Sequence, residues 1–240
     1  MTIYDHLVVF AFAVLYPAID LQYSKTFKRR ILTNNPRIRI RAYQHGIAWI
    51  WVLSIFTIAI WIYSKRALTN IGLDFSSAWQ AVTGLILLIS ALIYIRHVNH
   101  TIKNDADQRS AINSKLKDNS ASIYLPRTKR DFVWFMNLSI SAGICEELLF
   151  RGYLIWYIGE YSTTLVAIVL SSLLFGLAHS YQCWKGIVQS GGTGLVLAVI
   201  YVFTGSLWIP IALHIVGDVY SGMLGWLAFD ETVSNRTLPN

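Results

Sequence analysis

Cysteine and charged residues are scarce in this sequence, and each scarcity argues against a class of protein. The chain has 2 cysteines, Cys145 and Cys183, in or beside apolar segments and without metal-ligand spacing, so neither a disulfide framework nor a cysteine metal site is indicated. Cys145 precedes an acidic pair, but apolar surroundings make a thiol unreactive, and we interpret it as a small core residue. Charged residues make up 14% and hydrophobic residues 55% of the 240 residues, which is too apolar for an ordinary soluble domain.

Apolar tracts of roughly 20 residues recur along the whole chain, and this is the length that spans ~30 Å of hydrocarbon as a helix. They predict an all-α polytopic membrane bundle with about seven (six to eight) transmembrane helices. The first tract lacks a positively charged region and a small-residue cleavage site, so we expect a retained helix and not a signal peptide. The tracts lie near residues 3–19, 45–63, 76–95, 132–157, 161–179, 186–203 and 207–228.

The net charge of +7 is sorted by loop and does not indicate a nucleic-acid partner. Lysine and arginine gather in the loops 20–44 and 96–130, whereas the loop 64–75 has only Lys65 and Arg66. The positive-inside rule then predicts an N-terminus outside and a C-terminus in the cytoplasm, with the basic loops near anionic lipid. We expect an integral protein of a bacterial inner (plasma) membrane, and the sequence does not indicate its oligomeric state.

Ionisable residues divide the chain into two parts within one structural domain. The first three tracts contain none near their centres, apart from the flanking Asp5, His6 and His45, so we interpret residues 1–130 as scaffold helices with basic loops. All the acids, histidines and the arginine of the later tracts fall in residues 131–228. An ionisable group at membrane depth is costly unless it is paired, and it therefore indicates function. We expect residues 131–228 to be the catalytic core.

The segment Glu146-Glu147-Leu148-Leu149-Phe150-Arg151 places two carboxylates and a guanidinium in the fourth tract. On a helix Glu147 and Arg151 share a face, because residues four apart are neighbours, while Glu146 points elsewhere. Glu147 and Arg151 can neutralise each other and have a structural role. Glu146 has no local cation and needs a partner from another helix or a proton, which suits general acid–base chemistry.

Two more polar positions follow in later tracts. His179 comes four residues after Phe175, and His214 comes four residues before Asp218, so that imidazole and carboxylate share a helical face. Each histidine alone is explained as a satisfied structural residue. Three polar sites on separate apolar helices favour convergence on one wet cavity, where the groups satisfy one another.

The order Glu-Glu-x-x-x-Arg, Phe-x-x-x-His and His-x-x-x-Asn/Asp on successive hydrophobic helices resembles the CPBP family, the CAAX-processing and bacteriocin-processing (Abi) intramembrane endopeptidases. The resemblance covers roughly 131–225. It implies hydrolysis of a peptide bond in a membrane-associated protein or peptide. It further implies that Glu146 and His179 activate a water, that His214 and Asp218 stabilise the oxyanion, and that Glu147, Arg151 and Phe175 support the site.

Asp218 departs from the asparagine of eukaryotic CAAX processors. An ionised carboxylate cannot donate to an oxyanion, so either Asp218 is protonated or it orients His214, which then donates alone. We favour the orienting role, because the two residues are four apart on one helical face.

Alternatives remain open at this stage. Glu146, His179 and His214 could hold zinc in a metalloprotease, although no His-Glu-x-x-His motif preassembles two ligands, and we expect no cofactor. A proton-coupled transporter predicts an internal repeat, which the sequence lacks. A non-catalytic bacteriocin-immunity protein is a third reading. Straight helices also separate His179 from His214 in depth, so we expect a break near Gly143, a re-entrant turn at residues 191–194 or a deeper last segment.

Overall fold

The computed structural model describes residues 1–31, 37–74, 78–104, 110–111, 114, 116 and 120–229. The start of the third expected tract and parts of both basic loops lie outside these residues. Within the described part of the chain the regular elements are helices and there is no strand, which confirms the all-α prediction.

Every expected tract corresponds to a helix. Five helical stretches are long and apolar enough to cross a membrane: Ile3–Ile31, Arg37–Tyr63, Ala78–Thr101, Lys129–Gly159 and Ser180–Thr204. A shorter apolar helix follows at Thr164–Ala178. The elements are α1 (Ile3–Phe10), α2 (Tyr16–Ile31), α3 (Arg37–Tyr63), α4 (Ala78–Asn104), α6 (Lys129–Glu146), α7 (Ile155–Gly159), α8 (Thr164–Ala178), α9 (Cys183–Thr204) and α10 (Trp208–Phe229).

The first helical stretch is longer than its apolar tract predicts. A π-helical segment, Ala11–Leu15, joins α1 to α2, and helix continues to Ile31. The prediction of a loop beginning at residue 20 is therefore wrong, because the polar residues after it keep a helical pattern with a buried face that includes Ser24 and Phe27. As a consequence Asp20 lies inside a candidate membrane span.

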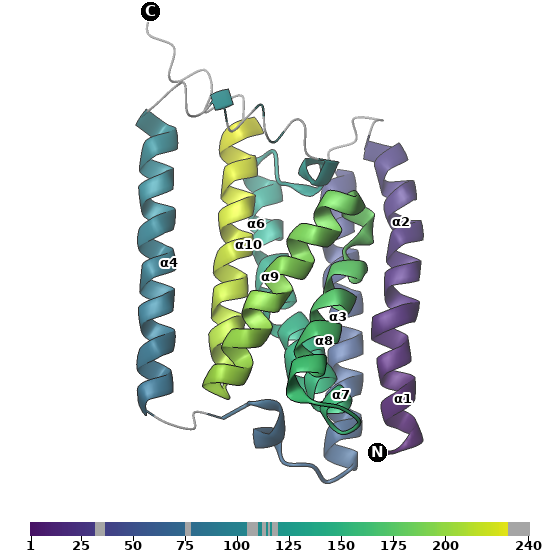
Figure 1. The fold of residues 1–240 in the computed structure, drawn as a ribbon. Helices are drawn as coiled ribbons and strands as arrows, with labels where there is room; N and C mark the ends of the chain where they lie inside the picture. Colours follow the sequence, from purple (N-terminus) through teal and green to yellow (C-terminus); the bar gives the residue numbers. More distant parts are fainter. Residues whose placement is uncertain are drawn as a thin grey trace, which may run out of the picture.

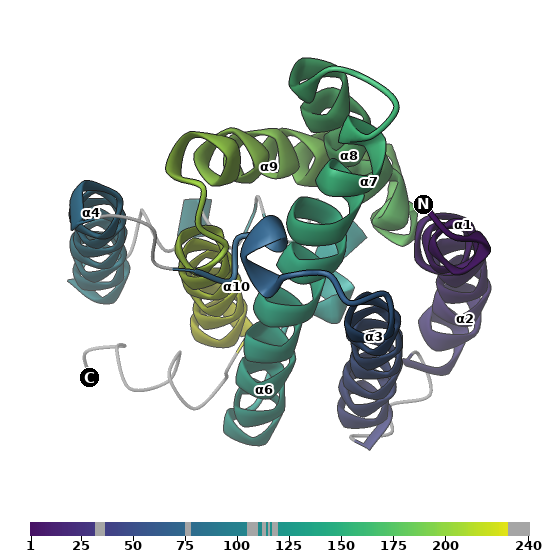
Figure 2. The ribbon, with the colours of Figure 1, turned by 90° about the horizontal axis from the view of Figure 1, so that it is seen from below.

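Helix α6 occupies the centre of the bundle, between α3 and α10, while α8 and α9 pack against each other along one side (Figures 1 and 2). Helix α4 packs on the outer side of α10 and is the least buried of the candidate spans. Its outward residues include Leu85, Ile86 and Ile93, whose exposure suits contact with lipid tails.

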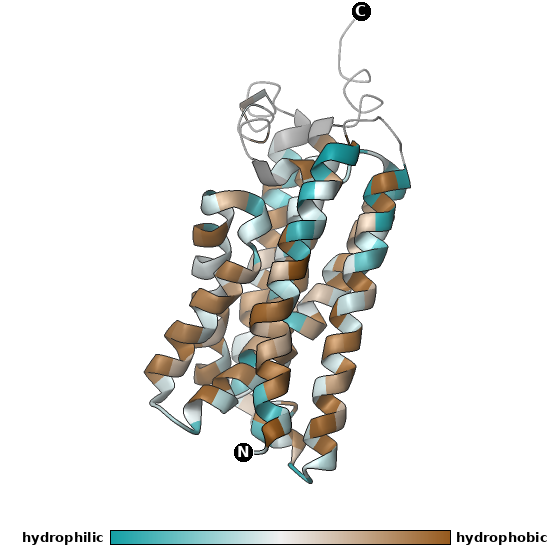
Figure 3. Ribbon diagram, turned by 90° about the vertical axis from the view of Figure 1, so that its right-hand side faces the viewer, coloured by the Kyte–Doolittle hydropathy of each residue, from teal (hydrophilic) through white to brown (hydrophobic). Residues whose placement is uncertain are grey.

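Polar residues gather mainly at the end of the bundle where α2 ends and α3 begins, and apolar residues dominate the middle of the helices (Figure 3). This distribution, with the long apolar helices, makes the chain an integral membrane protein. The N-terminus lies at the opposite end of the bundle (Figure 1). We keep the prediction that the polar end faces the cytoplasm.

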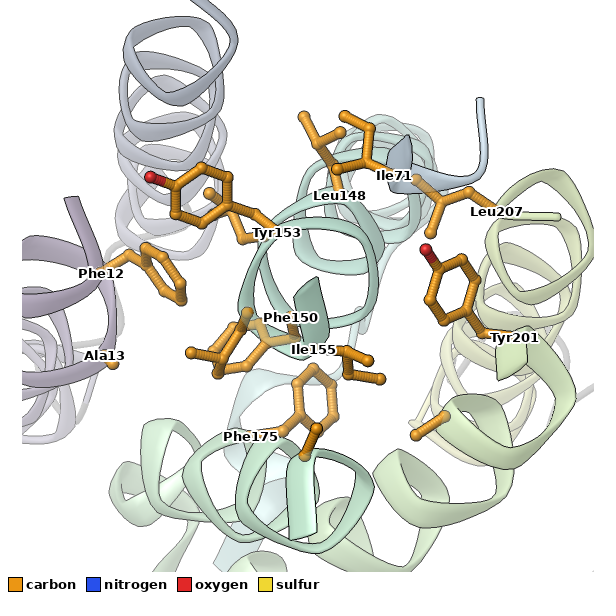
Figure 4. Close-up of a cluster of buried hydrophobic side chains, with 14 of the residues drawn as sticks. Phe12, Ala13, Ile71, Leu148, Phe150, Tyr153, Ile155, Phe175, Tyr201 and Leu207 are labelled. Carbon is orange, nitrogen blue, oxygen red and sulfur yellow. The ribbon is translucent and has the colours of Figure 1, made fainter. Parts of the chain in front are cut away.

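The core forms where two π-helical segments meet. Phe12, in the first, packs edge-on against Phe150 in the second, Glu147–Leu154, with 5.5 Å between ring centroids (Figure 4). Phe150 in turn meets Phe175 of α8 at 5.1 Å. The three aromatic rings are all buried, and they fix the fourth tract against both the N-terminal helix and α8.

A short helix resolves the difference in depth that straight spans imply. Helix α8 has 15 residues, about 22 Å at 1.5 Å per residue, so it ends within the thickness of the bundle and leaves His179 there. Gly191 and Gly194 lie inside α9, which excludes a re-entrant turn at that point. Gly143 lies inside α6, and the irregular stretch begins at Glu147.

Candidate active site

Glu147 and Arg151 form the buried ion pair that their spacing predicted. Arg151 Nη1 donates to Glu147 Oε1 at 2.5 Å, and the two side chains are 1% and 0% exposed respectively. Arg151 Nη2 also donates to the carbonyl of Gly194 in α9 at 3.2 Å, and the guanidinium lies over the Phe175 ring at 4.2 Å. Phe175 therefore contributes a cation–π contact to the pair.

The segment Glu147–Leu154 is π-helical, so its backbone hydrogen bonds join residues five apart instead of four. Ser171 of α8 donates its hydroxyl to the carbonyl of Phe150 at 2.7 Å. A buried carbonyl in the irregular segment is thereby satisfied from a neighbouring helix. This contact holds the segment that carries Glu147 and Arg151 against α8.

His214, in α10, is bound to the ion pair. Its Nδ1 lies 2.6 Å from Glu147 Oε1, the oxygen that also accepts from Arg151. Because a carboxylate oxygen accepts, Nδ1 of His214 is the donor and its Nε2 faces the opposite way. The other oxygen of Glu147, Oε2, is buried and has no hydrogen-bond partner among the described residues.

His179 lies at the C-terminal end of α8. Like His214, it has its Nδ1 atom held by a hydrogen bond. Its Nδ1 lies 2.8 Å from the carbonyl oxygen of Phe175, so that nitrogen carries the proton. In the neutral ring Nε2 is then an acceptor, and it lies 4.0 Å from Glu146 Oε2. The helix end thus fixes both the tautomer and the direction of this imidazole.

Glu146 is the point on which the two histidines converge. Its Oε2 lies 4.0 Å from His179 Nε2 and 3.8 Å from His214 Nε2. The same oxygen is buried and has no hydrogen-bond partner within the described part of the chain. These separations exceed a direct hydrogen bond and suit one water shared between a carboxylate and an imidazole. The sequence prediction that residues of separate helices converge is confirmed by these distances.

Asp218 lies at the edge of this group. Its Oδ2 is 3.7 Å from His214 Nε2, and its side chain is 38% exposed. The expected orienting contact between the two is absent at hydrogen-bond distance, because the Nδ1 atom of His214 is held by Glu147 instead. The spacing of residues along one helix could not predict the contact between His214 and Glu147, because the two residues lie on different helices.

A carboxylate and two imidazoles are groups that bind zinc, but the distances between them at Glu146 are longer than a zinc site needs. Tetrahedral zinc with ligands at 2.0–2.1 Å needs donor atoms about 3.4 Å apart. The carboxylate of Glu146 lies 4.0 Å and 3.8 Å from the nitrogens of His179 and His214. Among the described residues no group of three or more histidine, cysteine or acidic side chains is arranged to hold a metal ion. Zinc binding would require these side chains to close inward.

Two polar features near or beyond the site were not identified from the sequence. Asp20 of α2 interacts electrostatically with Glu146. Its place in a helix could have been predicted from the helical pattern of residues that continues beyond the first apolar tract. Asp5 was interpreted as a flanking residue, yet it is fully buried and accepts from both terminal nitrogens of Arg66 at 2.7 Å. No local spacing connects residues 61 positions apart.

Comparison with known proteins places part of the chain beside a family. Residues 128–220 match the family model described as type II CAAX prenyl endopeptidase, Rce1-like. No curated protein and no solved structure matches the chain. The matched segment contains the ion pair, both histidines and Asp218, and it agrees with the resemblance that the motifs indicated. Residues 128–220, fewer than half of the 240 residues, are therefore similar to the Rce1-like type II CAAX prenyl endopeptidases.

Proposed function

We propose that the chain hydrolyses a peptide bond of a membrane-associated protein or peptide with a water that Glu146 and His179 activate. The observation that carries this proposal is the convergence of His179 Nε2 and His214 Nε2 on the unpartnered oxygen of Glu146. A water between these groups would have acceptors on both sides, while the surrounding apolar helices exclude bulk solvent.

In the first step the water oxygen attacks the carbonyl carbon of the substrate and its proton passes to Glu146 or His179. His179 suits this role because the carbonyl of Phe175 holds its Nδ1 proton and leaves Nε2 free to accept. The proton then moves to the amide nitrogen as the C–N bond breaks, giving a carboxylic acid and an amine, and transfer of the acid's proton to the amine leaves a carboxylate and an ammonium group. The histidine and the glutamate return to their starting states.

His214 would stabilise the oxyanion of the tetrahedral intermediate. Glu147 accepts from its Nδ1 and favours the imidazolium, whose Nε2 proton then faces the reaction centre. Arg151 donates to the same carboxylate oxygen and holds the Glu147 side chain in place. Asp218, 3.7 Å from Nε2, adds negative charge that further favours the imidazolium.

A zinc-dependent mechanism with Glu146, His179 and His214 as ligands is the second candidate. It rests on the two imidazoles whose Nδ1 atoms are held by other groups, an arrangement that zinc ligands also have. Zinc would supply a bound water of lowered pKa. The two mechanisms use the same residues and differ in their response to a chelator.

The test is cleavage of a panel of quenched fluorescent peptides by detergent-purified protein. Glu146→Gln and His179→Ala are each expected to lower kcat by at least about 10³-fold while the protein stays monodisperse and its Tm changes little. Glu160→Gln changes an exposed glutamate outside the site and is the matched control. Wild-type activity that persists after prolonged treatment with a strong chelator supports the direct water mechanism.

Loss of activity on chelation that zinc restores would move the assignment to a metalloprotease. Cleavage unchanged in both site variants would overturn the proposed site, because the copurifying activity would then belong to another protein. A panel built on membrane-inserted peptides, with cleavage in the Glu160→Gln control, guards against a defect in the assay.

A further inference from the structure

Asp20 lies on the inward face of a membrane-spanning helix. Its neighbours one turn away on that face are Tyr16 and Ser24, and Phe27 follows at seven residues. Ser24 and Phe27 are buried, while Asp20 and Tyr16 are half-buried. This pattern turns the carboxylate of Asp20 toward the protein rather than toward lipid.

The inward face of α2 meets the turn that follows His179. Helix α2 packs against Ser180–Gln182 and also contacts α8. Lys28 Nζ donates to the carbonyl of Tyr181 at 2.9 Å, and the Tyr181 ring lies 5.8 Å from the His179 ring. Asp20 is close enough to interact electrostatically with both Tyr181 and Glu146. The carboxylate therefore faces the side of the reaction centre that His179 occupies.

Three other acids of the described residues each have an arginine partner, whereas Asp20 has none. Asp5 pairs with Arg66, Glu147 with Arg151, and Asp131 lies 4.0 Å from Arg39. Within the described residues Asp20 has neither an ion pair nor a hydrogen bond. A carboxylate at membrane depth without a partner is costly, and a ligand that supplies the partner gains that energy on binding.

The reaction centre also has a surplus of negative groups. Arg151 neutralises Glu147, which leaves Glu146, Asp218 and Asp20 to be offset only by the histidines. In a medium of low dielectric constant such a surplus attracts cations strongly and repels a second carboxylate.

We propose that Asp20 is a specificity-determining residue that binds an ammonium or guanidinium group of the substrate near the scissile bond. This inference rests on the proposed function, and it names the substrate class of that same site. The cation comes from a lysine or arginine side chain, or from the amino terminus of a short peptide. A site built to pair with a charge discriminates sharply against an isosteric neutral group, because the buried partner is then left alone.

The test measures kcat/KM for matched quenched peptides that carry lysine, arginine, norleucine or glutamate at each position flanking the scissile bond. Every peptide is made with a free and with an acetylated amino terminus, which separates the two sources of the cation. Wild-type protein is expected to prefer lysine or arginine over norleucine by about 10- to 100-fold. Asp20→Asn is expected to remove most of this preference, measured as the ratio of kcat/KM for the lysine peptide to kcat/KM for the norleucine peptide.

Two variants serve as controls. Asp74→Asn removes an exposed acid outside the candidate spans and is expected to leave the preference intact. Asp20→Lys is expected to reverse the preference toward the glutamate peptide, a result that partial misfolding cannot produce. A preference unchanged in Asp20→Asn, or an equal fall in activity on all peptides, would overturn the inference.

Binding separates this inference from the proposed function. In the His179→Ala background, fluorescence anisotropy of the lysine and norleucine peptides reports affinity without cleavage and leaves all the carboxylates in place. Lysine-selective binding that Asp20→Asn abolishes supports the inference even where no hydrolysis is seen. Equal affinity for both peptides overturns it, whatever the catalytic assays give.

Discussion

Two acid–arginine pairs of this protein, Asp5 with Arg66 and Glu147 with Arg151, lie in different parts of the chain, and they differ in how completely the hydrogen-bonding capacity of the carboxylate is used. In the N-terminal part, Asp5 accepts from Arg66 through both oxygens, from Tyr153 at 2.7 Å and from the backbone nitrogen of Thr2 at 2.6 Å. In the C-terminal part, one oxygen of Glu147 binds both Arg151 and His214, and the other has no hydrogen-bond partner among the described residues.

This difference separates a structural role from a chemical one. A carboxylate whose acceptors are all used has nothing left to offer a substrate, and it fixes the geometry of the chain. The Asp5 group joins the first helix to the loop after α3 and to the fourth tract, with Arg66 over the Trp156 ring at 4.5 Å. Glu147 is connected through His214 to the reaction centre, so a change in its charge reaches the catalytic groups.

The largest effect is expected for Arg151→Met. The substitution removes the arginine from the buried Glu147 carboxylate and leaves His214 as its hydrogen-bond partner, and breaking a buried pair on one side costs about 3–5 kcal/mol. We expect a large fall in Tm and in yield, measured by thermal unfolding in detergent, with no measurable peptide cleavage. The double variant Glu147→Leu/Arg151→Met is expected to recover most of the stability and none of the activity, because His214 still lacks its partner. Recovery of activity in the double variant would show that Glu147 and Arg151 contribute to stability and not to catalysis.

A smaller effect, confined to stability, is expected for Asp5→Asn. The change removes the charge that Arg66 binds, and since Arg66 is 15% exposed we expect a loss of about 2–3 kcal/mol. Activity per folded molecule is expected to stay within about twofold of wild type. The measurement is thermal unfolding alongside kcat on the same preparation. If kcat falls together with stability, the two pairs act as one unit and the comparison between them fails.

The sequence predicted the C-terminal part of the site better than the N-terminal part. Glu147 and Arg151 could be paired because both lie on one helix, and the order of polar groups along apolar tracts indicated His179 and His214. The contact between Glu147 and His214 spans 67 positions, and no local periodicity indicates it. Helix ends were missed where polar residues extend a helix, so Asp20 was placed in a loop although it lies within a span.

A helix contact beside the site is expected to show an intermediate effect. A Cβ at Gly143 would lie 2.4 Å from Ile215 Cγ1 and 3.2 Å from the backbone oxygen of Ile211, so Gly143→Ala must push α6 from α10. We expect about 1–3 kcal/mol of destabilisation and a fall of about tenfold in kcat, as Glu146 moves from His214. Thermal unfolding and peptide cleavage measure both effects.

Two glycines provide the controls for this substitution. A Cβ at Gly159, in the C-terminal part, would meet nothing within 4 Å, and one at Gly46 would make only an ordinary contact at 3.5 Å with Leu138. Both alanine variants are expected to match wild type in activity and to equal or slightly exceed it in stability, since alanine favours helix. A similar loss of activity in the Gly159 variant would show that the assay reports general damage to the C-terminal part.

The smallest effect concerns Tyr124, where the segment before α6 touches both parts of the molecule. Its hydroxyl lies 2.9 Å from Ser24 Oγ, and its ring packs against Phe27 at 5.2 Å and against Tyr181 at 5.1 Å. Tyr124→Phe keeps the ring contacts and removes one hydrogen bond, so we expect a loss of at most about 1 kcal/mol near neutral pH. Tyr124→Ala also removes the ring contacts with Phe27 and Tyr181. We expect it to lower kcat, because Tyr181 packs beside His179.

The dependence of this small effect on pH tests whether Tyr124 is held between the two parts as described. Burial raises the pKa of Tyr124 to about 12, against about 10 in an unfolded chain. The unfolded state therefore releases the phenol proton above pH 10 while the folded state retains it, and the stability of wild type falls between pH 10 and 12. Tyr124→Phe has no such group, so its stability relative to wild type should rise from pH 8 to pH 11 in paired unfolding experiments. The lysines and the other tyrosines are the same in both proteins, so their effect on stability cancels in the difference between wild type and variant. A difference that stays constant over this range would place the ring in water, and the N-terminal part would then not reach His179 through Tyr124 and Tyr181.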